Sequence, residues 1–432
     1  MSTHFEPGPL HFRSNMKILW LCPELPYPLT TGFLRIYSLM REMSLRHDIT
    51  LVCLTERKEV TQETIDALTA HATSLTIVNE LSYPEPWFIK LVKEVPYFGA
   101  RIQLRWRKRN ASAEMRGAVQ RLLRKQPFDI VLLGGRYTLP AVRGIKLPMV
   151  MDYCDANCAR YLGEVRYAPL LRRPLMYLRY LRMKRLELHA ARMTPYSCFA
   201  SERDRNALLG PSSASEVVPQ GLDSEYWRRS GGKPEPNCVV FTGAMDYSPN
   251  DDGARFLIRE VLPLVRQAIP EFHTLIVGRD PLPALIAAAQ SSPDVIVTGA
   301  VPDIRPYLEK ASVYVAPLRF ASGVQNKVLE AMAMEVPVIT TPVVADGVVM
   351  DGVPAPLVVA QSAQEIADQI IALLRDGPER ERLGHAGREF VTRHCSWPRS
   401  AEKLEEMCMA AISSTKAVSG ASSPRVSQKQ CA

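Results

Sequence analysis

The stretch APLRFASGVQNKVLEAMAMEVPVIT, residues 316–340, decides the fold of this chain. An apolar run that ends in a proline, residues 313–318, predicts a buried strand. A loop of small and polar residues follows over 320–326, and apolar residues at helical spacing then predict a helix over 327–334. Pro337 ends this helix and a second strand begins after it. The stretch therefore predicts a strand, a glycine-containing loop and a helix N-terminus.

Such a helix N-terminus suits a phosphate group, because its first N–H groups are free and the helix dipole is positive there. Lys327 adds a cation at this point, and Glu330 lies one turn further on, where it can accept hydrogen bonds from hydroxyls of the same ligand. Arg319, before the loop, either reaches the phosphate or forms a structural ion pair. The alternative for the whole stretch is an ordinary strand–loop–helix unit of an α/β domain.

Length and composition limit the classes of protein. A chain of 432 residues exceeds what one hydrophobic core normally supports, so two domains are expected, and 47% hydrophobic with 23% charged residues is typical of a globular protein. The net charge of +8 favours anionic partners. No helix-turn-helix or aromatic-basic signature indicates nucleic acid, and the nine cysteines lack zinc spacing, so neither nucleic acid nor a metal is expected. No apolar run has transmembrane length and no signal peptide is visible, which predicts a cytoplasmic protein.

Buried strands alternate with helices in both halves of the chain. In the first half, the continuous apolar runs 16–22 and 49–54 flank a predicted helix over 33–46, which indicates a parallel strand–helix–strand unit. In the second half, the runs 238–243 and 274–278 alternate with helices in the same way. The sequence therefore predicts an α/β protein with two doubly wound, Rossmann-like parallel sheets.

Composition also predicts the boundaries of the domains. Residues 212–236 are rich in Gly, Ser and Pro, as expected of a hinge. The prediction is an unstructured leader (1–15), a first domain (16–211), this hinge (212–236), a second domain (237–396), a terminal helix (397–412) and a disordered tail (413–432).

Residues 16–410 resemble the retaining GT-B glycosyltransferases of family four, also described as glycosyl transferases group 1. The resemblance is carried by LEAMA around Glu330, PVI at 337–339, and the signposts CVVFTG, TLIVG and VTGAVPD earlier in the second half. It implies the GT-B fold, with two domains facing a cleft and the terminal helix crossing back over the first domain. The first domain would bind the acceptor and the second a nucleotide sugar. The form of the deciding stretch is similar to bacterial sugar transferases associated with exosortase and exopolysaccharide gene sets.

The resemblance also implies a set of donor-binding residues. They are Gly32 and Arg35 in the first domain, and Gly243, Asn250, Gly299, Val301, Arg319, Ser322, Gly323, Val324, Gln325, Lys327 and Glu330 in the second. The alternative interpretation is that Gly32 is a turn glycine and Arg35 a surface arginine.

This sequence departs from the family pattern at two places. Ser322 stands where the family has a second glutamate that contacts the donor sugar. Met245, Asp246 and Tyr247 stand where the family often has a second cation, so that role is expected to move to Arg35 or Arg279.

The chemistry implied by the resemblance needs no metal and no cofactor besides the nucleotide sugar as co-substrate. Cleavage concentrates negative charge on the leaving diphosphate, which Lys327 and the loop backbone would stabilise. Asp155 follows a predicted strand and is a candidate general base for the acceptor; its alternative role is a helix N-cap.

The leading hypothesis is a retaining glycosyltransferase that moves a sugar to a glycan or lipid-linked acceptor in bacterial exopolysaccharide biosynthesis. One alternative is a catalytically degenerate GT-B subunit that binds nucleotide or glycan, which Ser322 favours. Another is a nucleotide-sugar 2-epimerase, which shares the two-domain fold and would need catalytic acids and a histidine in the cleft.

Residues 87–109 combine aromatic side chains with clustered lysines and arginines. This combination suits peripheral contact with the anionic inner face of the cytoplasmic membrane. The alternative is a helical segment on the acceptor side whose basic face is solvated.

Overall fold

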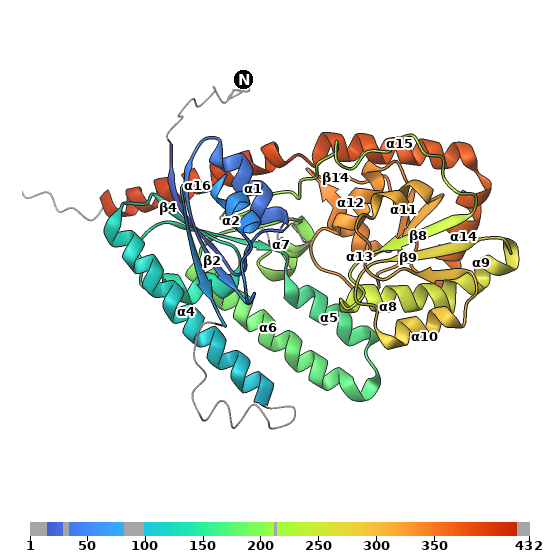
Figure 1. Ribbon diagram of the computed structural model, residues 1–432, viewed down its shortest axis with the longest axis horizontal. Helices are drawn as coiled ribbons and strands as arrows, with labels where there is room; N and C mark the ends of the chain where they lie inside the picture. The colour runs from blue at the N-terminus through green and yellow to red at the C-terminus, as the bar shows by residue number, and fades with distance from the viewer. Residues whose placement is uncertain (1–14, 29–33, 82–98, 211–213, 421–432) are drawn as a thin grey trace, which may run out of the picture. The chain divides into compact units, whose positions relative to one another are not determined.

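The computed structural model describes residues 15–28, 34–81, 99–210 and 214–420, and within them the chain forms two compact units (Figure 1). The first unit holds residues 1–151 and 405–432, and the second unit holds residues 152–404. The predicted leader therefore lies almost wholly outside the described residues. Its last residue, Asn15, is described, and it donates from its amide to the carboxylate of Asp48 at 3.3 Å.

A seven-stranded sheet has the order β3-β2-β1-β4-β5-β6-β7. Its strands are β1 (Lys17–Cys22), β2 (Asp48–Thr55), β3 (Ser74–Asn79), β4 (Ile130–Leu133), β5 (Met149–Cys154), β6 (Tyr196–Phe199) and β7 (Ser215–Val217). The pairs β1–β2, β2–β3, β1–β4, β4–β5 and β6–β7 are parallel. In β1 every residue after Lys17 is buried, as expected of a strand that is covered on both faces.

A six-stranded sheet has the order β10-β9-β8-β11-β12-β15, and all its neighbouring pairs are parallel. Its strands are β8 (Cys238–Thr242), β9 (His273–Val277), β10 (Val295–Val297), β11 (Val313–Ala316), β12 (Val338–Thr340) and β15 (Val358–Val359). The chain order reverses between β8 and β11, and α/β proteins bind ligands in the crevice beyond the carboxyl ends of the strands at such a point. The two doubly wound parallel sheets confirm the predicted fold class.

Helices connect the strands of both sheets, and further helices follow the last strand. They are α1 (Leu34–Ser44), α2 (Gln62–Thr69), α4 (Gly99–Lys125), α5 (Asn157–Tyr167), α6 (Arg173–Met193), α7 (Glu202–Leu208), α8 (Ser248–Phe256), α9 (Leu262–Ala268), α10 (Pro283–Gln290), α11 (Arg305–Lys310), α12 (Asn326–Ala333), α13 (Pro342–Ala345), α14 (Ala363–Arg375), α15 (Gly377–His394) and α16 (Trp397–Gly420). No helix in the described ranges combines the length and the apolar character that crossing a bilayer requires.

The boundary between the two sheets is not at the same place in the chain as the boundary between the two compact units. The last strand of the first sheet ends at Val217 and the first strand of the second begins at Cys238, so the sheets separate within the stretch predicted as a hinge. The compact units instead separate between Met151 and Asp152, inside β5. The reason is that side chains from the loops after β5 and β6 bond to the second half of the chain, as described below.

Three helical regions have irregular or unexpected boundaries. The helical segment that begins with α8 contains a π-helical turn, Leu257–Val261, because Pro263 has no N–H group to continue the regular ladder. The basic stretch over 164–192 forms two helices, α5 and α6, which are separated around Pro169. The terminal helix α16 continues past Ile412 to Gly420, so the first residues of the predicted tail are helical.

Candidate functional site

Lys327 and the loop after β8 meet at the carboxyl edge of the second sheet. Lys327 lies in the first turn of α12, and its Nζ donates a hydrogen bond to Oδ1 of Asn250. Gly243, the first residue after β8, has a φ of +156°, and a Cβ built there would lie 2.6 Å from Nδ2 of Asn250 and 3.3 Å from Nζ of Lys327. A glycine is therefore needed for the backbone to approach this lysine so closely. The structure brings together three of the predicted site residues here.

Glu330 on α12 is buried, and Lys327 is half-buried with its ammonium group against the buried side chains of Asn250 and Phe241. Burial lowers the pKa of Lys327 to about 7 and raises the pKa of Glu330 to about 7, and the attraction between the two charges opposes each shift. The ammonium group also lies 5.4 Å from the centre of the Phe241 ring. A buried cation that lacks a close carboxylate partner gains stability from an anionic ligand, and perturbed pairs of this kind gather at functional sites.

The loop between β11 and α12 is held in place by the first turn of α7. The backbone N–H of Gly323 donates to Oδ2 of Asp204 at 3.1 Å, and Nη2 of Arg203 donates to the carbonyl of Gly323 at 2.9 Å. Gly323 has a φ of +67°, a left-handed conformation that favours glycine. Within the loop, the Gln325 amide donates to the carbonyl of Ser322 at 2.9 Å.

Asp204 is the centre of this arrangement. Its side chain is fully buried and also accepts hydrogen bonds from the backbone N–H of Ala156 and from the hydroxyl of Ser201, which is the N-cap of α7. Arg203 donates to Asp204 at 2.8 Å and to the carbonyl of Val343. We call Arg203 and Asp204 the loop clamp, because together they join the loops after β5 and β11.

Asp155 contacts the loop at the position where the sequence departs from the family pattern. The hydroxyl of Ser322 donates to Oδ2 of Asp155 at 2.8 Å. Burial, followed by the nearby charge of Asp204, raises the pKa of Asp155 to about 6, and the hydrogen bond from Ser322 opposes this rise. A carboxyl group with this pKa is ionised at neutral pH and exchanges its proton easily.

Asp155 does not take its alternative role as a helix cap. The N-cap position of α5 is Ala156, without a side-chain cap. The first backbone N–H groups of the helix, those of Asn157 and Cys158, instead donate to the carboxylate of Glu187, each at 3.1 Å.

Arg160, on α5, lies beside Tyr247. Tyr247 occupies a position where the resemblance predicts a cation. The guanidinium of Arg160 is 5.5 Å from the centre of the Tyr247 ring and bonds to Glu164 at 2.6 Å. The hydroxyl of Ser248 donates to the same carboxylate at 2.6 Å. Burial raises the pKa of Tyr247 to about 12, so its phenol remains neutral. The sequence analysis did not identify Arg160, because no motif near it in the chain indicates a functional role.

Comparison with known proteins identifies the second half of the chain. Residues 236–376, a stretch that contains Gly243, Asn250, Lys327 and Glu330, match the protein family described as Glycosyl transferases group 1. We call this matched stretch the group 1 domain. The match covers the loops that gather around Lys327.

One curated relative is the GDP-mannose-dependent alpha-(1-6)-phosphatidylinositol monomannoside mannosyltransferase of Mycobacterium tuberculosis, which is 26% identical over 46% of this chain and 56% of its own length. The chain thus spans about half the length of this relative. Among solved structures, sucrose-phosphate synthase from Thermosynechococcus elongatus superposes with a TM-score of 0.66 at 14% identity, over 92% of this chain and all of that one. HepE from Anabaena, in complex with UDP and glucose, gives 0.64 at 13% identity over the same shares. These structures show that the fold is GT-B.

Other predicted residues of the group 1 domain lie at the same sheet edge or near it. Gly299 follows β10 with a φ of +70°, and a Cβ there would meet no atom within 4 Å, so the backbone faces open space. Val301 and Val324 are half-buried in their loops. Gly32 lies outside the described residues, and Arg35 is buried on α1 in the first unit.

Two predicted phosphate ligands carry ion pairs. Arg319 donates two hydrogen bonds to Asp252, at 2.9 and 2.6 Å, and lies over the rings of Tyr167 and Phe256. This contact corresponds to the structural ion pair that the sequence left open as an alternative. Arg279, proposed to supply the second cation, is exposed and bonds to Asp280 at 2.6 Å.

One group of side chains among the described residues has the composition of a metal site. Ligand atoms of Glu235, Cys238 and His273 lie within 4.8 Å of one another. However, burial raises the pKa of the Cys238 thiol to about 12, and the ammonium of Lys310 lies 3.0 Å from Glu235. The group lies at the amino ends of β8 and β9, the opposite sheet edge from Lys327. We interpret it as an ion-pair cluster.

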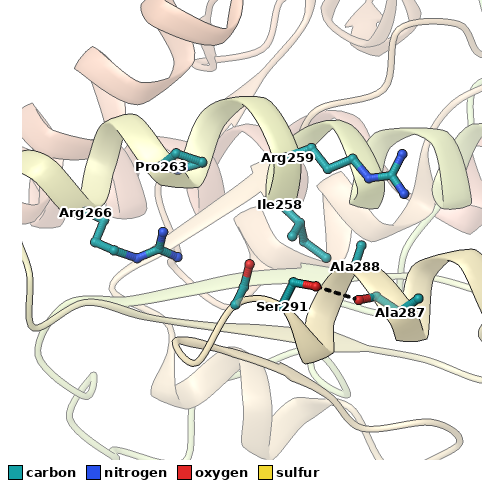
Figure 2. A pocket seen from close by; sticks show the side chains of 8 residues that line it. Ile258, Arg259, Pro263, Arg266, Ala287, Ala288 and Ser291 are labelled. Atoms are coloured by element: carbon teal, nitrogen blue, oxygen red, sulfur yellow. Dashed lines mark hydrogen bonds between the residues drawn. The ribbon is translucent and has the colours of Figure 1, made fainter.

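A surface hollow of the group 1 domain lies between α9, which carries Arg266, and the end of α10, which is followed by Ser291 (Figure 2). Arg266 extends toward α10 in this view and bonds to Asp294, and the Ser291 hydroxyl donates to the carbonyl of Ala287 at 3.2 Å. Helical residues and the turn after α10 line the hollow, so it is separate from the strand ends at Lys327.

Proposed function

We propose that this protein is a glycosyltransferase that moves a sugar from a nucleotide-diphosphate sugar to a glycan or lipid-linked acceptor. The observation that carries the proposal is Lys327 at the start of α12, against the glycine loop after β8 and at the topological switch point of the second sheet. A diphosphate there would receive the ammonium group, the helix dipole and the loop N–H groups together.

The proposed reaction breaks the bond between the anomeric carbon and the diphosphate oxygen. Charge that develops on that oxygen is stabilised by Lys327 and the N-terminus of α12, which needs no metal ion. The acceptor hydroxyl attacks the anomeric carbon from the face that the diphosphate leaves, so the configuration is retained. Its proton passes to Asp155 or to the leaving phosphate, and Glu330 accepts hydrogen bonds from the ribose hydroxyls.

The acceptor and the cellular role extend this proposal. The curated mycobacterial relative is named for a phosphatidylinositol mannoside acceptor, which supports a lipid-linked acceptor at the cytoplasmic face of a membrane. The form of the deciding stretch favours exopolysaccharide biosynthesis. A degenerate binding subunit is the second candidate, favoured by Ser322; the positions of Lys327 and Glu330 favour the enzyme. A 2-epimerase would need a histidine, and none takes part in the contacts described here around Lys327 and Asp155.

A transfer assay separates these functions. The purified protein is incubated with membrane extract and a panel of nucleotide sugars that includes GDP-mannose and UDP-glucose. We expect one donor to release nucleoside diphosphate and label the extract. Glu330→Gln is expected to keep its fold and lose most of the activity, because a neutral amide accepts weaker hydrogen bonds from ribose. Binding without transfer would favour the degenerate subunit, and interconversion of free nucleotide sugars would favour the epimerase.

The role of Asp155 as a base predicts a pH dependence. The base must be ionised, and the pKa of Asp155 is about 6, so kcat should fall about tenfold for each pH unit below 6. Asp155→Asn should lower kcat and remove this acidic limb. Asp280→Asn, which alters an exposed carboxylate, should leave the profile unchanged. An acidic limb that persists in Asp155→Asn would assign the titration to another group.

Membrane contact through residues 87–109 remains a proposal. Only residues 99–109, at the start of α4, belong to the described structure, and there Ile102, Leu104, Arg105, Lys108 and Arg109 are exposed. Each exposed cation near an anionic surface adds about 1 kcal/mol to binding. Changing Arg105, Arg107, Lys108 and Arg109 to Ser should therefore weaken co-sedimentation with anionic vesicles and leave nucleotide binding intact. Equal sedimentation of the variant and the native protein would make this face an ordinary solvated one.

A further inference from the structure

Helix α6 is covered by little of the part of the chain that the structure describes. Of its 21 residues only Glu187 and Ala190 are buried, although it packs along α5 (Figure 1). A short turn, Leu170–Arg172, precedes it. Neighbouring elements usually cover a long helix on at least one apolar face, so the uncovered part of α6 needs an explanation.

Large apolar side chains lie on this uncovered part. Leu171, Leu175 and Leu178 are 96%, 59% and 62% exposed. Leu171 lies in the turn before α6, and Leu175 and Leu178 lie four and seven residues further on, in the first turns of the helix. Residues at this spacing fall on one side of a helical segment, and we call these three the leucine stripe. Leu170 beside them is 74% exposed. Single exposed leucines are common, but a continuous apolar stripe marks an interaction surface.

The charge around the stripe is almost entirely positive. Residues 166–193 contain seven arginines, one lysine and a single acid, Glu187. That acid is buried and accepts hydrogen bonds from the start of α5, so it does not offset the surface charge. Arg182 and Arg185 are exposed on the turns that follow Leu178 on the same face. The partner of this surface should therefore be anionic as well as apolar.

We propose that the leucine stripe and the arginines beside it dock this protein on an anionic lipid bilayer. The leucines would enter the boundary between headgroups and acyl chains, and the arginines would meet lipid phosphates. Tyr177 and Tyr180 on the same helix are side chains that favour this boundary. The residues of this surface are different from those proposed for membrane contact at 87–109, and docking does not depend on sugar transfer.

The size of the stripe favours a bilayer over a protein partner. A stable protein interface buries roughly 800 Å² on each partner, whereas three leucines offer only a few hundred Å² of apolar surface. Binding to a bilayer does not require such an area. A few inserted apolar side chains, together with cations that contact the headgroups, are sufficient for reversible binding. Binding should therefore weaken as salt screens the arginines.

Co-sedimentation of the full chain with phosphatidylcholine vesicles, with and without phosphatidylglycerol, tests the proposal. We expect binding only with phosphatidylglycerol. The variant Leu171→Ser/Leu175→Ser/Leu178→Ser should bind about 10- to 100-fold more weakly. Its melting temperature should fall by only a few degrees, because the replaced side chains are largely exposed and serine is only a slightly poorer helix former than leucine. The matched control is Leu45→Ser/Leu282→Ser/Ile286→Ser, which removes three exposed apolar side chains elsewhere and should bind like the native protein.

A charge variant tests the second half of the proposal. Arg182→Ser and Arg185→Ser should each lower binding about fivefold at low salt and flatten its salt dependence. Equal binding to both kinds of vesicle, no binding, or native binding by the leucine variant would overturn the proposal. So would a native dimer in light scattering that the leucine variant converts to a monomer, because the stripe would then be a contact between two copies of the chain.

Discussion

Replacing Lys327 with methionine is expected to weaken nucleoside diphosphate binding by about 1.5–3 kcal/mol, roughly 10- to 150-fold. Methionine preserves most of the apolar volume of the lysine stem and removes the ammonium group that donates to Asn250. Binding of the nucleoside alone should hardly change, since the lost interaction is with phosphate. Isothermal calorimetry with both ligands measures the difference.

The same variant should be more stable than the native protein when no ligand is bound. Burial lowers the pKa of Lys327 from 10.5 to about 7, so the folded protein holds this proton less well than the unfolded chain does. Each pKa unit corresponds to about 1.4 kcal/mol of stability. Part of the gain is lost because the side-chain oxygen of Asn250 no longer has its donor, so we expect a net gain of about 1–3 kcal/mol. The gain should be largest below pH 7 and should disappear above about pH 10.5, where the unfolded lysine also loses its proton.

The matched control is Lys310→Met, which changes an exposed lysine at the other edge of the sheet. It should leave both diphosphate binding and stability almost unchanged. Equal losses of nucleoside and nucleoside diphosphate affinity in Lys327→Met would remove this lysine from the phosphate site. A Lys327→Met protein that is less stable than the native one at pH 7 would show that the buried ammonium is compensated within the fold.

The two expected effects of Lys327→Met, weaker diphosphate binding and a more stable free protein, have one cause: the group 1 domain encloses charged groups. Lys327 and Glu330 lie one turn apart on α12, and burial costs both of them free energy because it removes their charged groups from water. The two groups are not close enough to each other for an ion pair in the described structure. A ligand with a diphosphate and vicinal hydroxyls would satisfy both. We therefore expect the free protein to gain stability when such a ligand binds, as is common where function requires polar groups inside a protein.

Local sequence signals were sufficient for the elements of this site. The predicted strand over 313–318 is observed as β11, Val313–Ala316, and the helix expected from Lys327 is α12, Asn326–Ala333. These predictions were confirmed because a buried parallel strand is a continuous apolar run and a helix repeats its apolar residues every three or four positions. The glycine loop between them also follows from local composition.

Side-chain contacts over long sequence distances could not be predicted. Ser322 and Asp155 are 167 residues apart, and Gly323 and Asp204 are 119 apart. The pattern of Ser201 and Asp204 indicates a helix start, but a capping pattern does not show that the same carboxylate also holds a distant loop. Likewise, no feature of the sequence near Arg160 indicates that it lies over Tyr247.

The loop clamp supplies the prediction with the largest effect on stability. Asp204→Ala is expected to lower the free energy of unfolding by about 3–5 kcal/mol, because it leaves the guanidinium of Arg203 and the backbone N–H groups of Gly323 and Ala156 without their buried acceptor. That is a large fraction of the 5–15 kcal/mol by which domains are typically stable. Urea denaturation measures the loss.

Asp204→Asn distinguishes the charge from the hydrogen bonds. Its amide oxygen still accepts from one N–H group, so the loss should be smaller than in Asp204→Ala, and the loop over 320–326 should exchange its amide hydrogens faster than in the native protein. The control is Glu381→Ala, which removes an exposed carboxylate from helix α15 and should cost less than about 0.5 kcal/mol. An Asp204→Ala protein that unfolds at the native urea midpoint, with unchanged exchange in this loop, would show that the clamp contributes nothing to holding the loop at the start of α12.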